Sequence, residues 1–460
     1  MINYKKYFKN KKITIMGLGL LGRSIAYTKF LAECGALLTV TDLKSRDMLA
    51  SSIKLLSKYR NPEGKGTSYG AGIKFVLGEH RLIDFQNADM VIKSAGVPLD
   101  SIYTKEAIKN KIPIEMDASL FAKLAPEVTI IGVTGTRGKT MTTMLIYEIL
   151  KESGKALKRK VYAGGNIRGG ATLPLLSKVK AGLPAQAGDI VVLELDSWQL
   201  QGFGDAKISP QISVFTSFMP DHMNYYKDNM KKYFEDKANI FKYQKKGDIL
   251  VICPDMKKLI PKSLKSKLIV INKKNVESFD FAVPGEHQRE NLACAVEVAK
   301  QFNIPISNIK KVVKNFKGVE GRLQYIKTVK GVKIYNDNNA TTPEATISGL
   351  EALGGKKKNI ILIAGGADKG LDVVPLVKAI DKYCKAVVLL AGTGTDELLS
   401  SKQKVVSVKA NSLNEAVSKS VASAKKGDII LFSPAFASFG MFTNEYDRND
   451  KFLEIIKKLR

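Results

Sequence analysis

Several residue types are scarce in this sequence, and each scarcity narrows the class of protein that it can encode. The 460 residues include four cysteines, Cys34, Cys253, Cys294 and Cys384, with no CxxC pair and no metal-binding spacing. Such scattered cysteines predict buried free thiols in a reducing cytoplasm, and they argue against a disulfide framework or a zinc-finger site. No apolar run approaches the roughly 20 residues that a membrane-spanning helix needs, so we expect no membrane partner.

Acidic residues are also scarce relative to basic ones. Asp and Glu number 44 against 73 Lys and Arg, which gives a formal net charge of +29. The excess could indicate a nucleic-acid partner, but the lysines are spread over the whole length and no nucleic-acid-binding motif accompanies them. We therefore expect no specific nucleic-acid partner. Attraction of anionic small substrates and a plain bias toward surface lysine both remain open explanations.

What the sequence contains throughout is an alternation of short apolar runs with helical patterns. Many runs are continuously apolar and β-branched, as are strands buried on both faces of a parallel sheet. The pattern predicts an α/β fold, and the length suits about three domains at roughly 150 residues each. We expect these domains at residues 1–117, 118–318 and 319–460. The expected strands are residues 13–16, 37–41, 90–94, 129–134, 190–195, 212–216, 249–252, 332–335, 359–364 and 429–432.

A first glycine-rich loop, GLGLLG at residues 17–22, follows an expected strand and opens an expected helix. Asp42 ends the next strand, twenty residues after Gly22. Glycines allow a tight turn and a close approach of the backbone to a phosphate at a helix N-terminus. This spacing is the dinucleotide-binding fingerprint, which on its own favours a nicotinamide-dependent oxidoreductase. A Rossmann-like domain that holds another nucleotide, or one that uses the glycines only for packing, fits equally well.

A second loop, VTGTRGKT at residues 133–140, lies between an expected strand and an expected helix. Gly135 and Gly138 would let backbone N–H groups wrap a polyphosphate. Lys139 would place a cation at the β- and γ-phosphates, and the Thr140 hydroxyl would reach Mg²⁺. The strict P-loop pattern needs a glycine where Val133 stands, so this loop is a shortened variant. The sequence therefore predicts a nucleoside triphosphate site at the centre of the chain.

Two polar side chains are expected to converge on this loop. Glu194 lies in the expected strand at 190–195, and His222 follows the one at 212–216. Ligands bind beyond the carboxyl ends of parallel strands, where both side chains would lie. A carboxylate suits Mg²⁺, whereas an imidazole needs support from oxygen ligands. As isolated residues, all three histidines in the chain would more often be structural, and His80 is expected to be incidental.

Taken together, these motifs resemble the Mur ligase family of ATP-dependent amide-bond-forming enzymes. The resemblance covers the whole chain, because the matching strings follow one another in the family's order. The string DNNATT at residues 337–342 is closer to the D-glutamate-adding branch than to the other branches. The matching strings are GLGLLG, VTGTRGKT, AGGNIRG, ELDSWQL, PDHMNYY, YFEDKANIF, GEHQREN, EGRLQ, NDNNAT, AGGADKG and LFSPAFASF.

The resemblance implies a fold and an activity. The N-terminal domain would be Rossmann-like and bind a UDP-sugar, the central P-loop-type domain with a mostly parallel sheet would bind ATP, and the C-terminal domain would be Rossmann-like and bind an amino acid. The implied reaction adds D-glutamate to UDP-N-acetylmuramoyl-L-alanine through an acyl phosphate, with ATP and two Mg²⁺ ions, in peptidoglycan precursor synthesis. We expect a cytoplasmic monomer. A sister ligase with another amino-acid acceptor, a non-enzymatic nucleotide-binding regulator and, less favoured, a nicotinamide-dependent oxidoreductase remain alternatives.

Carried over to matching positions, the resemblance also implies roles for individual residues. The catalytic residues would be Lys139, Glu194, His222 and Lys237. The metal ligands would be Thr140, Glu194, His222 and Lys237, the lysine as a carbamate. ATP would be bound by Gly135, Thr136, Arg137, Gly138, Lys139, Thr140, Asn291, Arg322 and Asp337. The sugar nucleotide would contact Gly17, Leu18, Gly19, Leu20, Gly22, Asp42, Asn166 and Gln199. The incoming amino acid would contact Thr341, Lys369 and Ser438.

Some positions depart from the family's pattern. The most important is Asn339, which replaces a lysine expected to help bind the glutamate carboxylate. Losing a cation at a dicarboxylate site bears on the identity of the amino acid and leaves the ligase class untouched. The other departures are Arg137 for an asparagine, Asp196 for a serine, Gly321 for a histidine, and Glu445 at an aromatic position with Tyr446 next to it.

Overall fold

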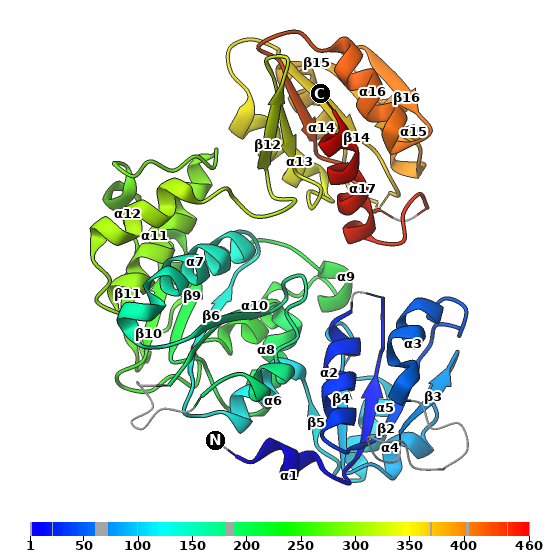
Figure 1. The fold of residues 1–460 in the computed structure, drawn as a ribbon, viewed down its shortest axis with the longest axis vertical. Helices are drawn as coiled ribbons and strands as arrows, with labels where there is room; N and C mark the ends of the chain where they lie inside the picture. The colour runs from blue at the N-terminus through cyan, green and yellow to red at the C-terminus, as the bar shows by residue number, and fades with distance from the viewer. Residues whose placement is uncertain are drawn as a thin grey trace. The chain divides into compact units, whose positions relative to one another are not determined.

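The computed structural model describes residues 2–20, 22–59, 72–98, 100–180, 188–368, 370–401, 404–438 and 440–459. The chain divides into two compact units. One unit comprises Met1–Asn275 with Glu290–Ile309, and the other comprises Val276–Arg289 with Lys310–Arg460. Two parallel sheets lie in the first unit and one mixed sheet in the second (Figure 1). The predicted α/β fold with three sheets and their helices is therefore confirmed.

The first sheet has five parallel strands in the order β3-β2-β1-β4-β5. The chain runs outward from the central strand β1 to β2 and β3 on one side, and later to β4 and β5 on the other. In such a sheet the crevice for a ligand opens at the carboxyl ends of β1 and β4, which is where the first glycine-rich loop lies. The strands are β1 (Lys12–Met16), β2 (Leu37–Asp42), β3 (Ile73–Leu77), β4 (Met90–Lys93) and β5 (Ile114–Glu115). The helices are α1 (Tyr4–Phe8), α2 (Arg23–Glu33), α3 (Ala50–Leu56), η1 (Ser57–Tyr59), α4 (Ile83–Gln86) and α5 (Ile102–Lys109).

The second sheet has six parallel strands in the order β11-β10-β9-β6-β8-β7. Its middle strands are buried along nearly their whole length, as expected when helices cover both faces. The strands are β6 (Thr129–Thr134), β7 (Val161–Gly165), β8 (Ile190–Glu194), β9 (Ile212–Phe215), β10 (Ile249–Ile252) and β11 (Lys267–Val270). The helices are α6 (Asp117–Leu124), α7 (Lys139–Leu157), η2 (Leu173–Ser177), α8 (Ser197–Asp205), α9 (Met223–Tyr226), α10 (Met230–Ala238), η4 (Pro254–Leu259), η5 (Lys273–Val276), α11 (Glu286–Lys300) and α12 (Ile306–Asn315).

The register of this second sheet aligns the carboxyl ends of its three middle strands. Val133 on β6 pairs with Glu194 on β8, and Thr134 pairs with Phe215 on β9. The glycine-rich loop after β6, the carboxylate at the end of β8 and the segment after β9 therefore all leave the sheet at one edge.

The third sheet lies in the second unit, with the order β12-β13-β17-β14-β15-β16, and only β12 is antiparallel to its neighbour. Side chains of β14 alternate between two apolar clusters, with Leu362 on one face and Ile361 and Ile363 on the other. The strands are β12 (Gln324–Val329), β13 (Val332–Asn336), β14 (Ile360–Ala364), β15 (Cys384–Leu390), β16 (Ser407–Ala410) and β17 (Ile429–Phe432). The helices are α13 (Pro343–Leu353), α14 (Val374–Tyr383), α15 (Thr393–Ser400), α16 (Leu413–Ser423) and α17 (Glu445–Lys458).

Two predictions about the whole chain can be compared with this fold. All four cysteines are buried free thiols, as predicted. Among the helices in the described ranges, none is long and apolar enough to cross a membrane. The domain boundaries expected at residues 118 and 319 stay a prediction.

Candidate active site

The second glycine-rich loop connects β6 to α7, and two of its positions accept only glycine. Gly135 has a φ of +149°, and a Cβ there would lie 2.0 Å from Thr216 Oγ1. Gly138 has a φ of +83°, and a Cβ there would lie 2.3 Å from Asn291 Oδ1. The loop is therefore packed between the end of β9 and α11 without room for a side chain at either position.

Hydrogen bonds hold the loop from both sides. On the β9 side, the backbone N–H groups of Thr136 and Arg137 donate to Ser217 O and Oγ, both at 2.8 Å. On the α11 side, Thr142 Oγ1 donates to Asn291 Oδ1 at 3.2 Å. The structure thus brings Asn291 to the loop although 149 residues separate it from Thr142. The loop runs into the N-terminus of α7, where helix N–H groups favour an anion.

Two lysine side chains meet at one backbone oxygen of this loop. Lys237 Nζ donates to Gly135 O at 2.8 Å, and Lys139 Nζ donates to the same oxygen at 3.0 Å and to Thr136 O at 3.1 Å. Lys237 is 1% exposed. Burial, followed by the charge of Lys139, holds the pKa of the Lys237 amine well below its usual value. Two adjacent lysine amines, one of them buried, disfavour a second positive charge here, and a nearby anion would offset it.

The predicted acidic and imidazole residues lie in the same electrostatic environment. The charges of Asp196, Asp221 and Glu194 each act to raise the pKa of Lys237, against the larger effect of burial. Burial also lowers the pKa of His222, which lies 3.7 Å from Asp221 and is influenced by the charges of both lysines. The structure therefore gathers four residues at the edge of the sheet where β6, β8 and β9 end. These residues, predicted from separate strings, are Lys139, Lys237, Glu194 and His222.

These side chains could hold a divalent ion only together with further oxygen ligands, such as phosphate or water. In the part of the chain that the structure describes, no three His, Cys, Asp or Glu side chains are grouped so that they could hold a metal ion. The predicted ligands include just two such residues, Glu194 and His222, with the Thr140 hydroxyl and the Lys237 amine. Mg²⁺ usually takes one or two carboxylates together with substrate phosphates and water. The donor set therefore fits Mg²⁺ that arrives with a nucleotide, and metal binding here stays a prediction.

The first glycine-rich loop is held by its own carboxylate. Asp42 is 4% exposed, and its Oδ2 accepts hydrogen bonds from Leu18 N and Gly19 N, both at 2.9 Å. Its Oδ1 accepts one from Lys44 N at 2.9 Å. In a dinucleotide-binding loop such N–H groups are available for a pyrophosphate, whereas here two of them already bond Asp42. The contact of Asp42 with uracil or ribose stays a prediction.

Asn166 and Gln199 lie beside the end of β8, on the side that faces the first sheet. Asn166 N donates to Glu194 O at 2.8 Å, and its Oδ1 accepts from Arg23 Nη2 at 2.7 Å. Gln199 is 3% exposed and forms a capping box with Asp196 at the start of α8. Sequence reasoning missed Arg23, although a cation directly after a glycine-rich loop is a signal for an anion site.

The single tryptophan was also missed. The ring of Trp198 on α8 lies 4.7 Å from the ring of His222 and 5.5 Å from that of Tyr225, measured between centroids. A Cβ at Gly96, after β4, would lie 3.9 Å from the same indole. Trp198 therefore packs against both His222 and the segment that follows β4.

The remaining predicted residues belong to the second unit. Asp337 follows β13 and accepts hydrogen bonds from Leu323 N at 3.0 Å and from Ser433 Oγ at 2.8 Å. Burial raises the pKa of Asp337 to about 7. Arg322 adjoins Leu323, Thr341 N donates to Asn339 O at 3.1 Å, and Ser438 is 5% exposed. Lys369 lies outside the described residues. The roles of these residues in binding ATP and an amino acid stay predictions.

A buried arginine, which sequence reasoning missed, fixes the segment that contains Asn339. Arg448 on α17 is 1% exposed, and it donates from Nε to Asn338 Oδ1 at 2.8 Å and from Nη2 to Asn338 O at 2.9 Å. Burial lowers the pKa of this arginine to about 10. Asn338 also donates to Glu445 O at 2.9 Å. The string NDNNAT is thus tied to the start of α17, where Glu445 departs from the family's pattern.

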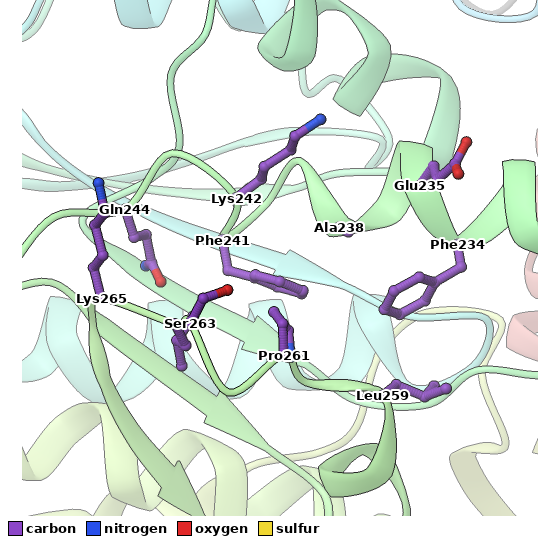
Figure 2. Close-up of a pocket in the computed structure, with 11 residues that line it drawn as sticks. Phe234, Glu235, Ala238, Phe241, Lys242, Gln244, Leu259, Pro261, Ser263 and Lys265 are labelled. Atoms are coloured by element: carbon purple, nitrogen blue, oxygen red, sulfur yellow. The ribbon is translucent and has the colours of Figure 1, made fainter.

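A separate cavity of about 470 Å³ lies on the other side of α10. Figure 2 shows the rings of Phe234 and Phe241 near Pro261 and Leu259 in its wall, with Gln244 beside them. The Gln244 amide donates to Pro210 O, Ser213 Oγ and Ile249 O. None of the predicted site residues lines this cavity.

Comparison with protein families identifies two regions. Residues 133–273 match the model of the Mur ligase middle domain, and residues 321–436 match that of the Mur ligase glutamate ligase domain. The chain is 34% identical over 475 residues to the UDP-N-acetylmuramoylalanine--D-glutamate ligase of Borreliella burgdorferi, covering 98% of each. It is 32% identical over 486 residues to the enzyme of the same name from Clostridium botulinum, covering 99% of this chain and 98% of the relative.

Solved structures share the fold. The UDP-N-acetylmuramate-alanine ligase MurC from Thermotoga maritima superposes with a TM-score of 0.60 at 17% identity, over 98% of this chain and 100% of that one. The MurF ligase from Thermotoga maritima in complex with ADP gives a TM-score of 0.55 at 20% identity, over 81% of this chain and 88% of that one. At these identities the likeness concerns the fold alone.

The glycine at position 138 provides a test of the loop as a nucleotide site. Gly138→Ala places a Cβ 2.3 Å from Asn291 Oδ1 at a φ of +83°, so we expect the loop to shift and the dissociation constant for ADP to rise at least about tenfold, or ~1.4 kcal/mol. Isothermal titration calorimetry measures this change. Gly355→Ala is the control, because a Cβ there meets nothing within 4 Å. Equal ADP affinity in both variants would contradict the assignment of the loop.

The raised pKa of Asp337 predicts a pH-dependent stability. Because burial raises the pKa of Asp337 from its usual value of 3.8 to about 7, the folded state holds a proton that the unfolded state releases. The free energy of unfolding therefore decreases as pH rises from 4 to 7 and is constant above that range. At roughly 1 to 2 kcal/mol per pH unit, this contribution to the free energy of unfolding should fall by roughly 2 to 3 kcal/mol between pH 5 and pH 7. Urea unfolding followed by circular dichroism should show that loss in the wild type relative to Asp337→Asn. Parallel pH profiles would show that Asp337 is not the group responsible.

Proposed function

The chain belongs to the Mur ligase family, and from that premise we propose that it is an ATP-dependent carbon–nitrogen ligase that adds D-glutamate to UDP-N-acetylmuramoyl-L-alanine in peptidoglycan precursor synthesis. The observation that carries the proposal is similarity along 98–99% of the chain to relatives that are named for this reaction. The gathering of Lys139, Lys237, Glu194 and His222 at one strand edge supports it independently. The oxidoreductase alternative is not favoured.

ATP would bind across the loop between β6 and α7. Lys139 would turn from its present backbone acceptors to the β- and γ-phosphates, and the N-terminal amides of α7 would face the same charge. Asn291 would lie beside the nucleotide, because it already contacts the loop at Gly138. The family resemblance also assigns Arg322 and Asp337 to the binding of ATP.

Mg²⁺ would be held by residues that the structure gathers at this edge. Thr140 and Glu194 would hold one ion, and His222 with Lys237 would hold a second. When bound, these ions neutralise charge on the transferring phosphoryl group. The depressed pKa of Lys237 favours a neutral amine, and a neutral amine can attack CO₂ to form a carbamate by losing a proton. That carbamate gives Lys237 the anionic oxygen that a hard cation prefers.

The reaction follows from this arrangement. The terminal carboxylate of UDP-N-acetylmuramoyl-L-alanine attacks the γ-phosphorus of ATP, and ADP leaves with the electrons of the broken P–O bond. Lys139 and the α7 amides stabilise the charge that develops on the phosphoryl oxygens. The amine of D-glutamate then attacks the acyl phosphate, loses a proton, and displaces inorganic phosphate to leave an amide. Water must be excluded while the acyl phosphate exists.

The two substrates would lie on different sheets. The first glycine-rich loop, with Asp42, Asn166 and Gln199, would hold the sugar nucleotide in a domain at residues 1–117 and at the adjoining edge of the central domain, residues 118–318. Thr341, Lys369 and Ser438 would receive D-glutamate in a domain at residues 319–460. The four free thiols support a cytoplasmic location, and a monomer suffices for this mechanism.

The proposed reaction predicts which molecules release phosphate from ATP. Phosphate release should require both UDP-N-acetylmuramoyl-L-alanine and D-glutamate, because the acyl phosphate forms only with the first and turns over only with the second. A coupled phosphate assay across a panel of D- and L-amino acids measures this dependence. Turnover with another amino acid in place of D-glutamate would support the sister-ligase alternative that Asn339 raises. Release that is indifferent to every amino acid would contradict the ligase assignment.

The proposed carbamate predicts chemical rescue at Lys237. Lys237→Ala should lower kcat by at least about 100-fold, the upper range for the loss of a metal-positioning group. Added short carboxylic acids such as formate or acetate should restore part of that activity by supplying an anionic oxygen in the vacated space. Lys242→Ala is the matched control, since Lys242 is exposed near the same helix and its variant should neither lose activity nor respond to carboxylates. Activity that no carboxylate restores would count against the carbamate.

A further inference from the structure

One proposed metal ligand, His222, precedes a helix of a single turn. The carbonyl oxygen of His222 accepts hydrogen bonds from Tyr225 N at 2.9 Å and from Tyr226 N at 3.1 Å, at the start of α9. A helix of four residues is not stable by itself in water, because the first turn costs more conformational entropy than its hydrogen bonds return. The position of His222 therefore depends on what holds α9.

The backbone on both sides of α9 is strained. His222, Lys227 and Asp228 have φ values of 55°, 51° and 57°, in the left-handed region that residues other than glycine seldom adopt. Such conformations persist only where the surrounding structure imposes them. Contacts made by α9, rather than local preference, must therefore fix this segment.

One polar contact of α9 is with a carboxylate oxygen on α10. Tyr226, which is 4% exposed, donates from its hydroxyl to Asp236 Oδ2 at 2.9 Å. Gln201 Nε2 on α8 donates to the same oxygen at 2.8 Å and to Tyr225 Oη at 3.1 Å. One carboxylate oxygen thus joins α8, α9 and α10 in a half-buried setting.

We propose that Asp236 is a positioning residue that, through Tyr226, holds His222 where it can bind a divalent ion. The proposal rests on the function proposed above, in which His222 is a metal ligand. Asp236 immediately precedes Lys237 on α10. This one helix therefore places both ligands of the proposed second ion, Lys237 by carrying it and His222 by the Asp236–Tyr226 hydrogen bond, and it sets the distance between them.

The chain of contacts from Asp236 to the imidazole is continuous. The Asp236 carboxylate accepts from the Tyr226 hydroxyl, and the Tyr226 amide donates to the carbonyl oxygen of His222. The imidazole then contacts the ring of Trp198 on α8, with 4.7 Å between the centroids and 46° between the ring planes. Loss of the Tyr226 hydroxyl removes the hydrogen bond that joins α9 to Asp236. The contact of the Tyr226 ring with Tyr233, the Gln201–Tyr225 hydrogen bond and the Trp198–His222 ring contact remain.

The test is Tyr226→Phe, which removes one hydroxyl and keeps the ring. We expect the Mg²⁺ concentration for half-maximal ligation to rise about tenfold, the lower range for loss of a group that orients a metal ligand, while kcat at saturating Mg²⁺ and the melting temperature change little. A purely structural hydroxyl would lower the melting temperature and leave the Mg²⁺ dependence unchanged. That outcome would overturn the proposal.

Metal binding can also be measured without turnover. The chain has three histidines, so selective ¹³C labelling gives three Cε1–H signals, which single substitutions assign. With ADP present, Mn²⁺ should broaden the His222 signal of the wild type, with His80 as the internal reference. In Tyr226→Phe the same broadening should need about ten times more Mn²⁺.

Two further variants make the experiment decisive. Tyr162→Phe is the matched control, because the hydroxyl of Tyr162 on β7 also donates one hydrogen bond, to Lys178 O at 3.0 Å. Loss of that hydroxyl should leave the Mn²⁺ titration unchanged. Asp236→Asn removes the charge at nearly constant shape and should shift the titration in the same direction as Tyr226→Phe. In a His222→Gln background, Tyr226→Phe should add no further loss of Mg²⁺ affinity, and additive losses would overturn the proposal.

The outcomes separate this inference from the function on which it rests. If Mn²⁺ leaves the His222 signal of the wild type sharp, the assignment of His222 as a metal ligand fails and the inference fails with it. If Mn²⁺ broadens that signal equally in the wild type and in Tyr226→Phe, the inference alone is overturned and the proposed ligase stands.

Discussion

Two lysine amines that share the carbonyl oxygen of Gly135 determine which charges the neighbouring strand ends of the central sheet must carry. Lys139 and Lys237 both donate to this oxygen, and Lys237 is buried. Like charges so close in a buried place are stable only if one of them gives up its proton or anions lie near. The depressed pKa of Lys237 reflects the first response, and the carboxylates at the ends of β8 and β9 provide part of the second. An anion bound at the loop would complete the balance of charge.

The sequence correctly places the glycine-rich loop between a strand and a helix, because the signals for all three are local. The glycines at 135 and 138 and the cation at 139 occupy one short string whose chemistry is evident without a fold. Strands at the middle of each sheet were also found, since continuous apolar runs mark them. Edge strands such as β11 and β12 were missed because most of their residues are exposed or half-buried, so their composition resembles that of loops.

What the sequence could not predict depends on contacts between distant residues. Arg23 reaches Asn166, and Arg448 reaches Asn338, each across more than 100 positions. Asp42 has the spacing of a ribose-binding acid, yet it caps the amides of its own glycine-rich loop. Gly321 and Asn339, which depart separately from the family's pattern, prove to be neighbours: Asn339 N donates to Gly321 O at 2.9 Å, and a Cβ at 321 would lie 3.0 Å from Asn339 Nδ2. A side chain at 321 would therefore require Asn339 to move, so the two positions should be treated as one unit when the acceptor site is altered.

The contact between the rings of Trp198 and His222 has a practical consequence. The chain contains one tryptophan, and its indole lies 4.7 Å from this imidazole. Indole emission responds to a neighbouring ring and to its charge, and here no second indole adds a background. A change in the charge or position of His222 should therefore alter the intrinsic fluorescence of the unlabelled protein.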